Sequence, residues 1–196
     1  MRVGSDWFEG AFPNGVGNWS QPPELALDGA RWPDGLRPLS DAVKESGLEF
    51  IVWVVSERSL TPGLIPFSVS THLQATTCGQ EPERAAPDTW LRRLYPEWML
   101  GNNPHANALL NLGDPDARGY IIDYISSAID AFGLSVFRTD YNIQPLALFL
   151  GPPYPDDATR RGSLEAKYVD GLYTFWDTVR HRNDGILVDN CASTYR

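Results

Sequence analysis

One segment restricts the fold more than any other feature of this sequence. Residues 48–55 read Leu-Glu-Phe-Ile-Val-Trp-Val-Val, a nearly continuous apolar run that is rich in β-branched residues. Shorter runs of the same kind occupy 109–112, 134–137 and 186–188. A strand with one face in water alternates apolar and polar residues, whereas a strand buried on both faces does not. The runs therefore predict strands of a parallel sheet that helices cover.

Helix patterns with recognisable ends separate these runs. Asp114-Pro115 provides an N-cap and a first-turn proline, and Gly133 is placed to end the same helix. A second apolar face lies in 164–179, and a third, in 36–43, is closed by Gly47. The residues that trace these three faces are Ile121, Ile125, Ile129 and Phe132; Leu164, Tyr168, Leu172, Phe175 and Val179; and Leu36, Leu39 and Val43. Alternating strands and helices predict βαβ units.

The number of strands limits the architecture. We count four strands and a possible fifth at 2–8, whereas a complete eight-stranded barrel typically needs about 250 residues. The 196 residues therefore form one domain, which is either part of a (β/α)8 barrel (TIM barrel) or a smaller open α/β sheet. We expect the strands containing Val52, Leu110, Phe137 and Leu187 to be parallel and adjacent in that order. Part of a barrel leaves strand edges unpaired, which predicts self-association.

Charge and composition exclude several classes of partner. The net charge of -9 disfavours nucleic acid and anionic membranes as partners, and it is compatible with a small neutral carbohydrate. The two cysteines are far apart, and no cysteine or histidine cluster has the spacing of metal ligands, so we expect no metal site. No apolar run is long enough to span a membrane, and no signal peptide is recognisable. The compartment stays open, with the cytoplasm favoured.

The clearest candidate for chemistry follows the third apolar run. Asp140 lies at the end of this strand with Arg138 and Asn142 on either side. In a barrel, active-site residues come from the C-terminal ends of strands. A neighbouring cation and amide keep a carboxylate ionised and oriented, as a nucleophile requires. The alternative is an aspartate that caps the next helix or forms an ion pair in a loop.

Several motifs in order along the chain resemble those of the melibiase-type α-galactosidases, glycoside hydrolase family 36. The segment Phe137-Arg138-Thr139-Asp140-Tyr141-Asn142 resembles the nucleophile motif K-W-D-M-N, in which some members carry Arg in place of Lys. The other matching segments are Gly17-Asn18-Trp19 with Trp32-Pro33-Asp34-Gly35-Leu36 (G-N-W and F-P-x-G-L), Phe50-Ile51-Val52-Trp53 with Glu57-Arg58 (F-G-L-W-x-E-P-E), Tyr95-Pro96-Glu97-Trp98 (H-P-x-W), Leu110-Asn111-Leu112-Gly113-Asp114-Pro115 (L-D-L-x-x-P) and Asp189-Asn190-Cys191-Ala192-Ser193 (E-N-C-S-S). The order of these matches favours homology and part of a (β/α)8 barrel.

The resemblance implies a retaining mechanism on terminal α-galactosides that needs two carboxylates and no cofactor. Asp140 is then the nucleophile. The residues that match substrate-binding positions are Trp53, Arg138, Asn142, Cys191, Ser193, Asp6 and Trp7. For Trp53, a place in the barrel core is the alternative to a place in the sugar-binding wall.

Four departures from the family pattern bear on activity. The acid/base aspartate of the family lies in an S-D motif one strand beyond the N-C-S segment, and it has no counterpart among these 196 residues. The first aspartate of D-D-G-W is replaced, since the segment reads Gly4-Ser5-Asp6-Trp7. Val55 stands where the family has its first glutamate after the tryptophan, and Thr194-Tyr195 replaces a glycine pair. An inactive carbohydrate-binding remnant is therefore the main alternative, and an unrelated open α/β domain is the second.

Overall fold

The computed structural model describes residues 2–3, 7–8, 18–20, 22–53, 84–85, 89–101, 108–141, 145–149 and 162–192. Its helices are η1 (Pro23–Ala26), α1 (Arg37–Glu45), α2 (Trp90–Leu94), η2 (Pro96–Trp98), α3 (Pro115–Phe132), α4 (Leu146–Phe149) and α5 (Ser163–Arg182). Its strands are β1 (Arg2–Val3), β2 (Ile51–Trp53), β3 (Arg84–Ala85), β4 (Met99–Leu100), β5 (Ala108–Leu110), β6 (Val136–Tyr141) and β7 (Leu187–Ala192). None of the helices described is long and apolar enough to cross a membrane.

A four-stranded sheet in the order β1-β2-β6-β7 forms the centre of the molecule. Each neighbouring pair of these strands is parallel. The Cα partners align Val52 with Phe137, and Phe137 with Val188. The predicted α/β class and the parallel arrangement of the strands containing Val52, Phe137 and Leu187 are confirmed.

The predicted place of Leu110 is wrong. Leu110 belongs to β5, which lies between β3 and β4 in a separate antiparallel sheet, so that β2 pairs directly with β6. All three residues of β5 are buried. Burial on both faces produces the same apolar run in either kind of sheet, and the run therefore predicts a buried strand without specifying its neighbours.

Helix α3 begins and ends where the sequence predicts. The Asp114 carboxylate accepts hydrogen bonds from the backbone N–H groups of Asp116 and Ala117 at 2.8 and 3.1 Å. Gly133 ends the helix with φ of 66°, a left-handed conformation that favours glycine. These two caps fix the length of the helix that connects the small antiparallel sheet to β6.

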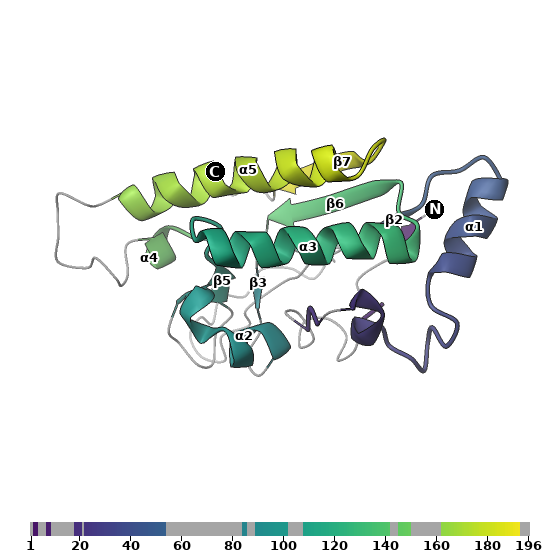
Figure 1. The fold of residues 1–196 in the computed structure, drawn as a ribbon, viewed down its shortest axis with the longest axis horizontal. Helices are drawn as coiled ribbons and strands as arrows, with labels where there is room; N and C mark the ends of the chain where they lie inside the picture. Colours follow the sequence, from purple (N-terminus) through teal and green to yellow (C-terminus); the bar gives the residue numbers. More distant parts are fainter. Residues whose placement is uncertain are drawn as a thin grey trace, which may run out of the picture.

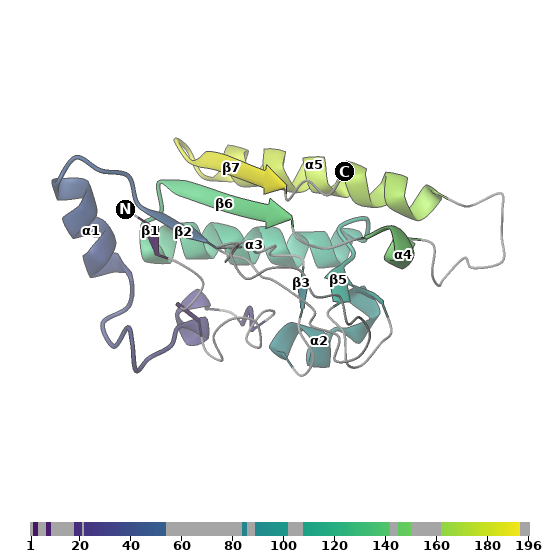
Figure 2. The same ribbon diagram turned by 180° about the vertical axis from the view of Figure 1, so that it is seen from behind.

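Helices α3 and α5 lie alongside each other on one face of the parallel sheet (Figures 1 and 2). Phe137 of β6 packs edge-on against Phe175 of α5, with ring centroids 6.0 Å apart. At Gly171, α5 approaches the turn before α3 so closely that an added Cβ would lie 1.9 Å from the Leu112 carbonyl oxygen. The helix layer is therefore held to the sheet by apolar side chains and, at one point, by backbone packed against backbone.

Helix α1 docks on the C-terminal end of α3. The buried Ser40 hydroxyl donates a hydrogen bond to the Gly133 carbonyl oxygen at 2.6 Å. The Arg37 guanidinium donates to the Asp130 carbonyl oxygen at 3.0 Å, and its Nε donates to the Asp41 carboxylate. Carbonyl groups at the end of a helix lack partners within it, so these contacts satisfy acceptors that α3 leaves open.

Candidate active site

The candidate site lies where β6 and β7 run side by side. Six Cα pairs join these strands, from Val136 with Leu187 to Tyr141 with Ala192. Both strands point toward the end of the sheet at which α4 lies, and their arrowheads mark this end in Figure 2. Each strand is apolar in its first two residues, and its polar residues begin at Arg138 in β6 and at Asp189 in β7. The polar residues therefore lie toward the C-terminal end of each strand.

Alternation along β6 separates its residues into two faces. Phe137 is buried against Phe175 of α5 and therefore belongs to the face that the helices cover. Neighbouring residues of a strand project to opposite faces. Positions 138 and 140 consequently belong to the face opposite α5, together with their partners 189 and 191 on β7.

An ion pair joins the two strands on that opposite face. Nη1 of Arg138 donates to the carboxylate of Asp189, its Cα partner in the register. The Arg138 side chain is 19% exposed and the Asp189 side chain 43% exposed. The guanidinium of Arg138 thus engages the Asp189 carboxylate on this face of the sheet.

A second contact joins the same strands one residue further along. The Thr139 hydroxyl donates to Oδ1 of Asn190 at 2.9 Å, and Thr139 is buried. Thr139 and Asn190 are Cα partners on the face that α5 covers. One side-chain contact on each face therefore supports the register of β6 against β7.

The register places four predicted site residues in two rows that are two residues apart along β6. Trp53 is the Cα partner of Arg138, and Asp140 is the Cα partner of Cys191. The backbone of the proposed nucleophile thus lies beside that of Cys191 and two residues beyond the Arg138–Asp189 pair. Asn142, Ser193, Asp6, Glu57 and the pair Thr194-Tyr195 lie outside the described residues.

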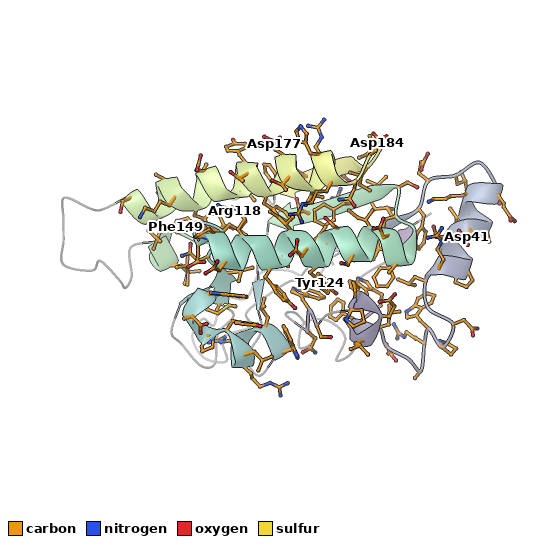
Figure 3. All side chains as sticks on the ribbon, in the orientation of Figure 1. Asp41, Arg118, Tyr124, Phe149, Asp177 and Asp184 are labelled. Carbon is orange, nitrogen blue, oxygen red and sulfur yellow. The ribbon has the colours of Figure 1, made fainter. Side chains whose placement is uncertain are left out.

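Trp7 is fully buried in an aromatic cluster. Its ring stacks on Trp19 with centroids 5.8 Å apart, and the edges of Phe8 and Phe132 pack against it. Tyr124 of α3, labelled in Figure 3, extends the cluster through Trp19. In the structure described, Trp7 contributes to the core, and its predicted contact with sugar remains a prediction.

The ion pair between Arg138 and Asp189 could not be predicted from the sequence. The two residues are 51 positions apart, and only the strand register brings them together. A partial signal exists, because each residue is the first charged one after an apolar run. That signal predicts two charges at the same end of the sheet, but it does not predict that they pair.

A group of four aromatic rings lies beside the beginning of α3. Tyr95 and Trp98 stack with centroids 3.9 Å apart, and both contact Tyr120, which also stacks on Trp90. The Tyr120 hydroxyl donates to the Trp19 carbonyl oxygen at 2.5 Å. Burial raises the pKa of the Tyr120 phenol, and Tyr95 adds to the effect, so this hydroxyl stays neutral. The Y-P-E-W segment thus packs on α3 as a structural element.

In the part of the chain that the structure describes, no three His, Cys, Asp or Glu side chains come together in a way that could hold a metal ion.

The fold resembles solved α-galactosidases. The structure of the α-galactosidase from Lactobacillus brevis matches 98% of this chain and 22% of its own, with a TM-score of 0.68 and 18% identity. The enzyme AgaA from Geobacillus stearothermophilus, solved as a variant in complex with stachyose, matches 97% of this chain and 23% of its own, with a TM-score of 0.68 and 21% identity. At these identities the likeness concerns the fold, which is that of part of a glycoside hydrolase family 36 α-galactosidase.

Sequence comparison agrees with the fold. A protein of Aspergillus flavus named "Probable alpha-galactosidase C" is 26% identical over 205 residues, which cover 95% of this chain and 22% of that protein. The chain therefore spans about a fifth of the length of the curated relatives that it matches. The model of the Melibiase family matches residues 53–195, well over half of the chain. The chain belongs to the melibiase family, and the relatives that it matches are α-galactosidases.

Proposed function

We propose that this chain is one domain forming part of a (β/α)8 barrel and carries the nucleophile half of a retaining α-galactosidase site. The order of the strands in the parallel sheet supports the barrel. Strands β1, β2, β6 and β7 lie side by side in the same order in which they occur along the chain, as strands of a (β/α)8 barrel do. The β3–β5 sheet is then an excursion between two barrel strands.

The observation that carries this proposal is the register of β6 and β7. It sets Asp140 beside Cys191 and Arg138 beside Asp189, at the strand ends where barrel enzymes have their active sites. A carboxylate in this place suits attack on an anomeric carbon, and the cation of Arg138 suits hydrogen bonds to ring hydroxyls.

The proposed reaction is the first step of α-galactoside hydrolysis. Asp140 attacks the anomeric carbon of a terminal α-galactoside, the bond to the leaving oxygen breaks, and a galactosyl-enzyme forms. Trp53, Asn142, Cys191 and Ser193 are the proposed sugar-binding residues around it, together with Asp6 and Trp7. The relatives' names and the stachyose complex of AgaA support a galactoside as the substrate.

The proton donor decides which substrates react. Asp189 is engaged by Arg138, and the acid/base aspartate of the family has no counterpart among these 196 residues. An aryl α-galactoside with a good leaving group needs little protonation for the first step, whereas an alkyl galactoside needs an acid. We therefore expect slow galactosylation by an activated aryl galactoside and almost no turnover of an unactivated one.

Mass spectrometry of the intact chain tests this proposal. The 196-residue chain is incubated with 2,4-dinitrophenyl α-galactoside, and a gain in mass of one galactosyl group is expected, which peptide mapping should locate on Asp140. The Asp140→Asn variant is the matched control and should gain no mass. Labelling that persists in this variant would show that another residue is the nucleophile.

A carbohydrate-binding remnant without turnover is the second candidate, and the lack of a counterpart to the family's acid/base aspartate among these 196 residues favours it. A remnant binds methyl α-D-galactopyranoside but does not gain mass from the activated substrate. Binding without labelling therefore supports the remnant, and labelling of Asp140 supports the enzyme.

A further inference from the structure

We propose that Asp189 is the positioning residue of the candidate site, anchoring the Arg138 guanidinium across the strand pair. The inference rests on the proposed function, and it assigns to Asp189 a role in holding the arginine that faces the sugar. The ion pair and the strand register carry it.

The ion pair is built on matched backbone positions. Arg138 and Asp189 are Cα partners in neighbouring parallel strands, and their side chains therefore leave the sheet on the same face. The Thr139–Asn190 hydrogen bond on the other face supports the same register. The carboxylate thus reaches the guanidinium from a position that the sheet itself fixes.

The exposure of the two partners argues for positioning rather than stability. The Arg138 side chain is mostly buried, whereas that of Asp189 is nearly half exposed. Ion pairs with an exposed partner contribute little to stability, because solvent screens them. A mostly buried arginine nevertheless needs an anion to fix the direction of its guanidinium, and Asp189 supplies it.

The anchored arginine lies on the strand that carries the proposed nucleophile. Positions 138 and 140 are two residues apart on β6 and therefore belong to the same face of the sheet. Asp189 engages Nη1 of Arg138 from the neighbouring strand β7. The N–H donors of an arginine lie in one rigid plane, so fixing one nitrogen sets the direction of the whole guanidinium.

The first measurement follows the guanidinium directly and needs no sugar. The Arg138 side-chain N–H signals are assigned in the 196-residue chain by their loss in Arg138→Lys. We expect protected Nη signals in the unmodified chain and loss of this protection in Asp189→Asn. The matched control is Asp184→Asn, because Asp184 lies at the turn before β7, toward the opposite end of α5 from Phe149 and α4 (Figure 3).

The second measurement follows binding of methyl α-D-galactopyranoside by calorimetry. Asp189→Asn should weaken binding by on the order of fivefold, the factor that corresponds to one screened ion pair. Its melting temperature should change by less than about 3 °C. Asp189→Glu, which keeps the carboxylate, should restore affinity, and Asp184→Asn should leave it unchanged.

The outcomes separate this inference from the proposed function. Protected Arg138 signals and unchanged affinity in Asp189→Asn would overturn the inference. If the unmodified chain binds no galactoside, the proposed function fails, and the guanidinium signals alone then decide whether Asp189 anchors Arg138. If Asp189→Glu fails to restore both the protection and the affinity, a positioning role for the carboxylate is excluded.

Discussion

At the scale of single residues, Gly171 shows how closely the helix layer meets the turn before α3. An added Cβ at Gly171 would lie 1.9 Å from the carbonyl oxygen of Leu112 and 2.5 Å from its carbonyl carbon. Both atoms belong to the backbone, so no side chain can rotate away to make room. Glycine is therefore required here by contact rather than by a left-handed conformation.

We expect Gly171→Ala to lower the free energy of unfolding by about 3 kcal/mol, the upper range for overpacked cores. Urea unfolding followed by circular dichroism measures this. Gly119→Ala on α3 is the matched control, because its added Cβ meets nothing within 4 Å. Alanine favours helix, so the control should gain up to about 1 kcal/mol. Equal stability of the two variants would show that the helices do not pack this closely.

Residues also differ in how far the sequence predicts their environment. The caps of α3 at Asp114 and Gly133 are confirmed, because local hydrogen bonds and backbone conformation determine them. The pairing of Arg138 with Asp189 depends on a contact across 51 residues, which no local pattern encodes. The placement of Asp140 beside Cys191 likewise required the register, although the strand-end position of each was apparent.

At the scale of elements, the junction of α1 with α3 depends on a few polar contacts. The buried Ser40 hydroxyl bonds the Gly133 carbonyl oxygen, and Arg37 bonds that of Asp130. Leaving a buried carbonyl oxygen without a donor lowers the free energy of unfolding by more than a typical hydrogen bond raises it. The hydroxyl at position 40 is therefore important for the docking of the whole helix.

Ser40→Ala should lower the free energy of unfolding by about 2 kcal/mol, since the Gly133 carbonyl then stays buried without this donor. Ser46→Ala is the comparison variant. Its exposed hydroxyl donates to the Ala42 carbonyl oxygen in the last turn of the same helix, which Ser46 caps, so the change should stay within about 0.5 kcal/mol. Chemical denaturation of both variants provides the measurement. A cost for Ser40→Ala as small as that for Ser46→Ala would contradict the docking role of the hydroxyl.

Whole elements, like single residues, could be predicted where a local pattern determines them and not where contacts between distant segments do. The apolar faces of α1, α3 and α5 were predicted, because a helix buries residues with a period that is visible in the sequence. The strand at Leu110 was also predicted, but its neighbours were not. Its burial arises from the antiparallel sheet around β5, and a buried run does not reveal which strand is adjacent to it.

At the scale of the whole molecule, large apolar side chains are exposed on β7 and on α5, which contacts it. Within the described part of the chain, β7 pairs with β6 alone. Leu187 of β7 is 61% exposed, and Tyr173 of α5 is 60% exposed. An apolar strand edge is a template for pairing with another chain. These residues give the prediction of self-association a specific location.

The isolated 196-residue chain should therefore associate as its concentration rises. Sedimentation equilibrium measures the mass, and Leu187→Lys should shift the chain toward monomer, because a charged edge strand resists pairing. Leu25→Lys serves as the control, since Leu25 is equally exposed but lies on η1, away from β7. A monomer at every concentration would contradict the prediction.

The strand register also determines how the candidate site tolerates changes in chain length. The turn at residues 183–186 precedes β7, so an insertion there leaves the pairing of 138 with 189 and of 140 with 191 intact. An insertion of one residue between 187 and 189 is different, because it moves every later side chain of β7 to the other face of the sheet. Asp189 and Cys191 would then face α5. We therefore expect the candidate site to tolerate a one-residue insertion before β7 but not within it.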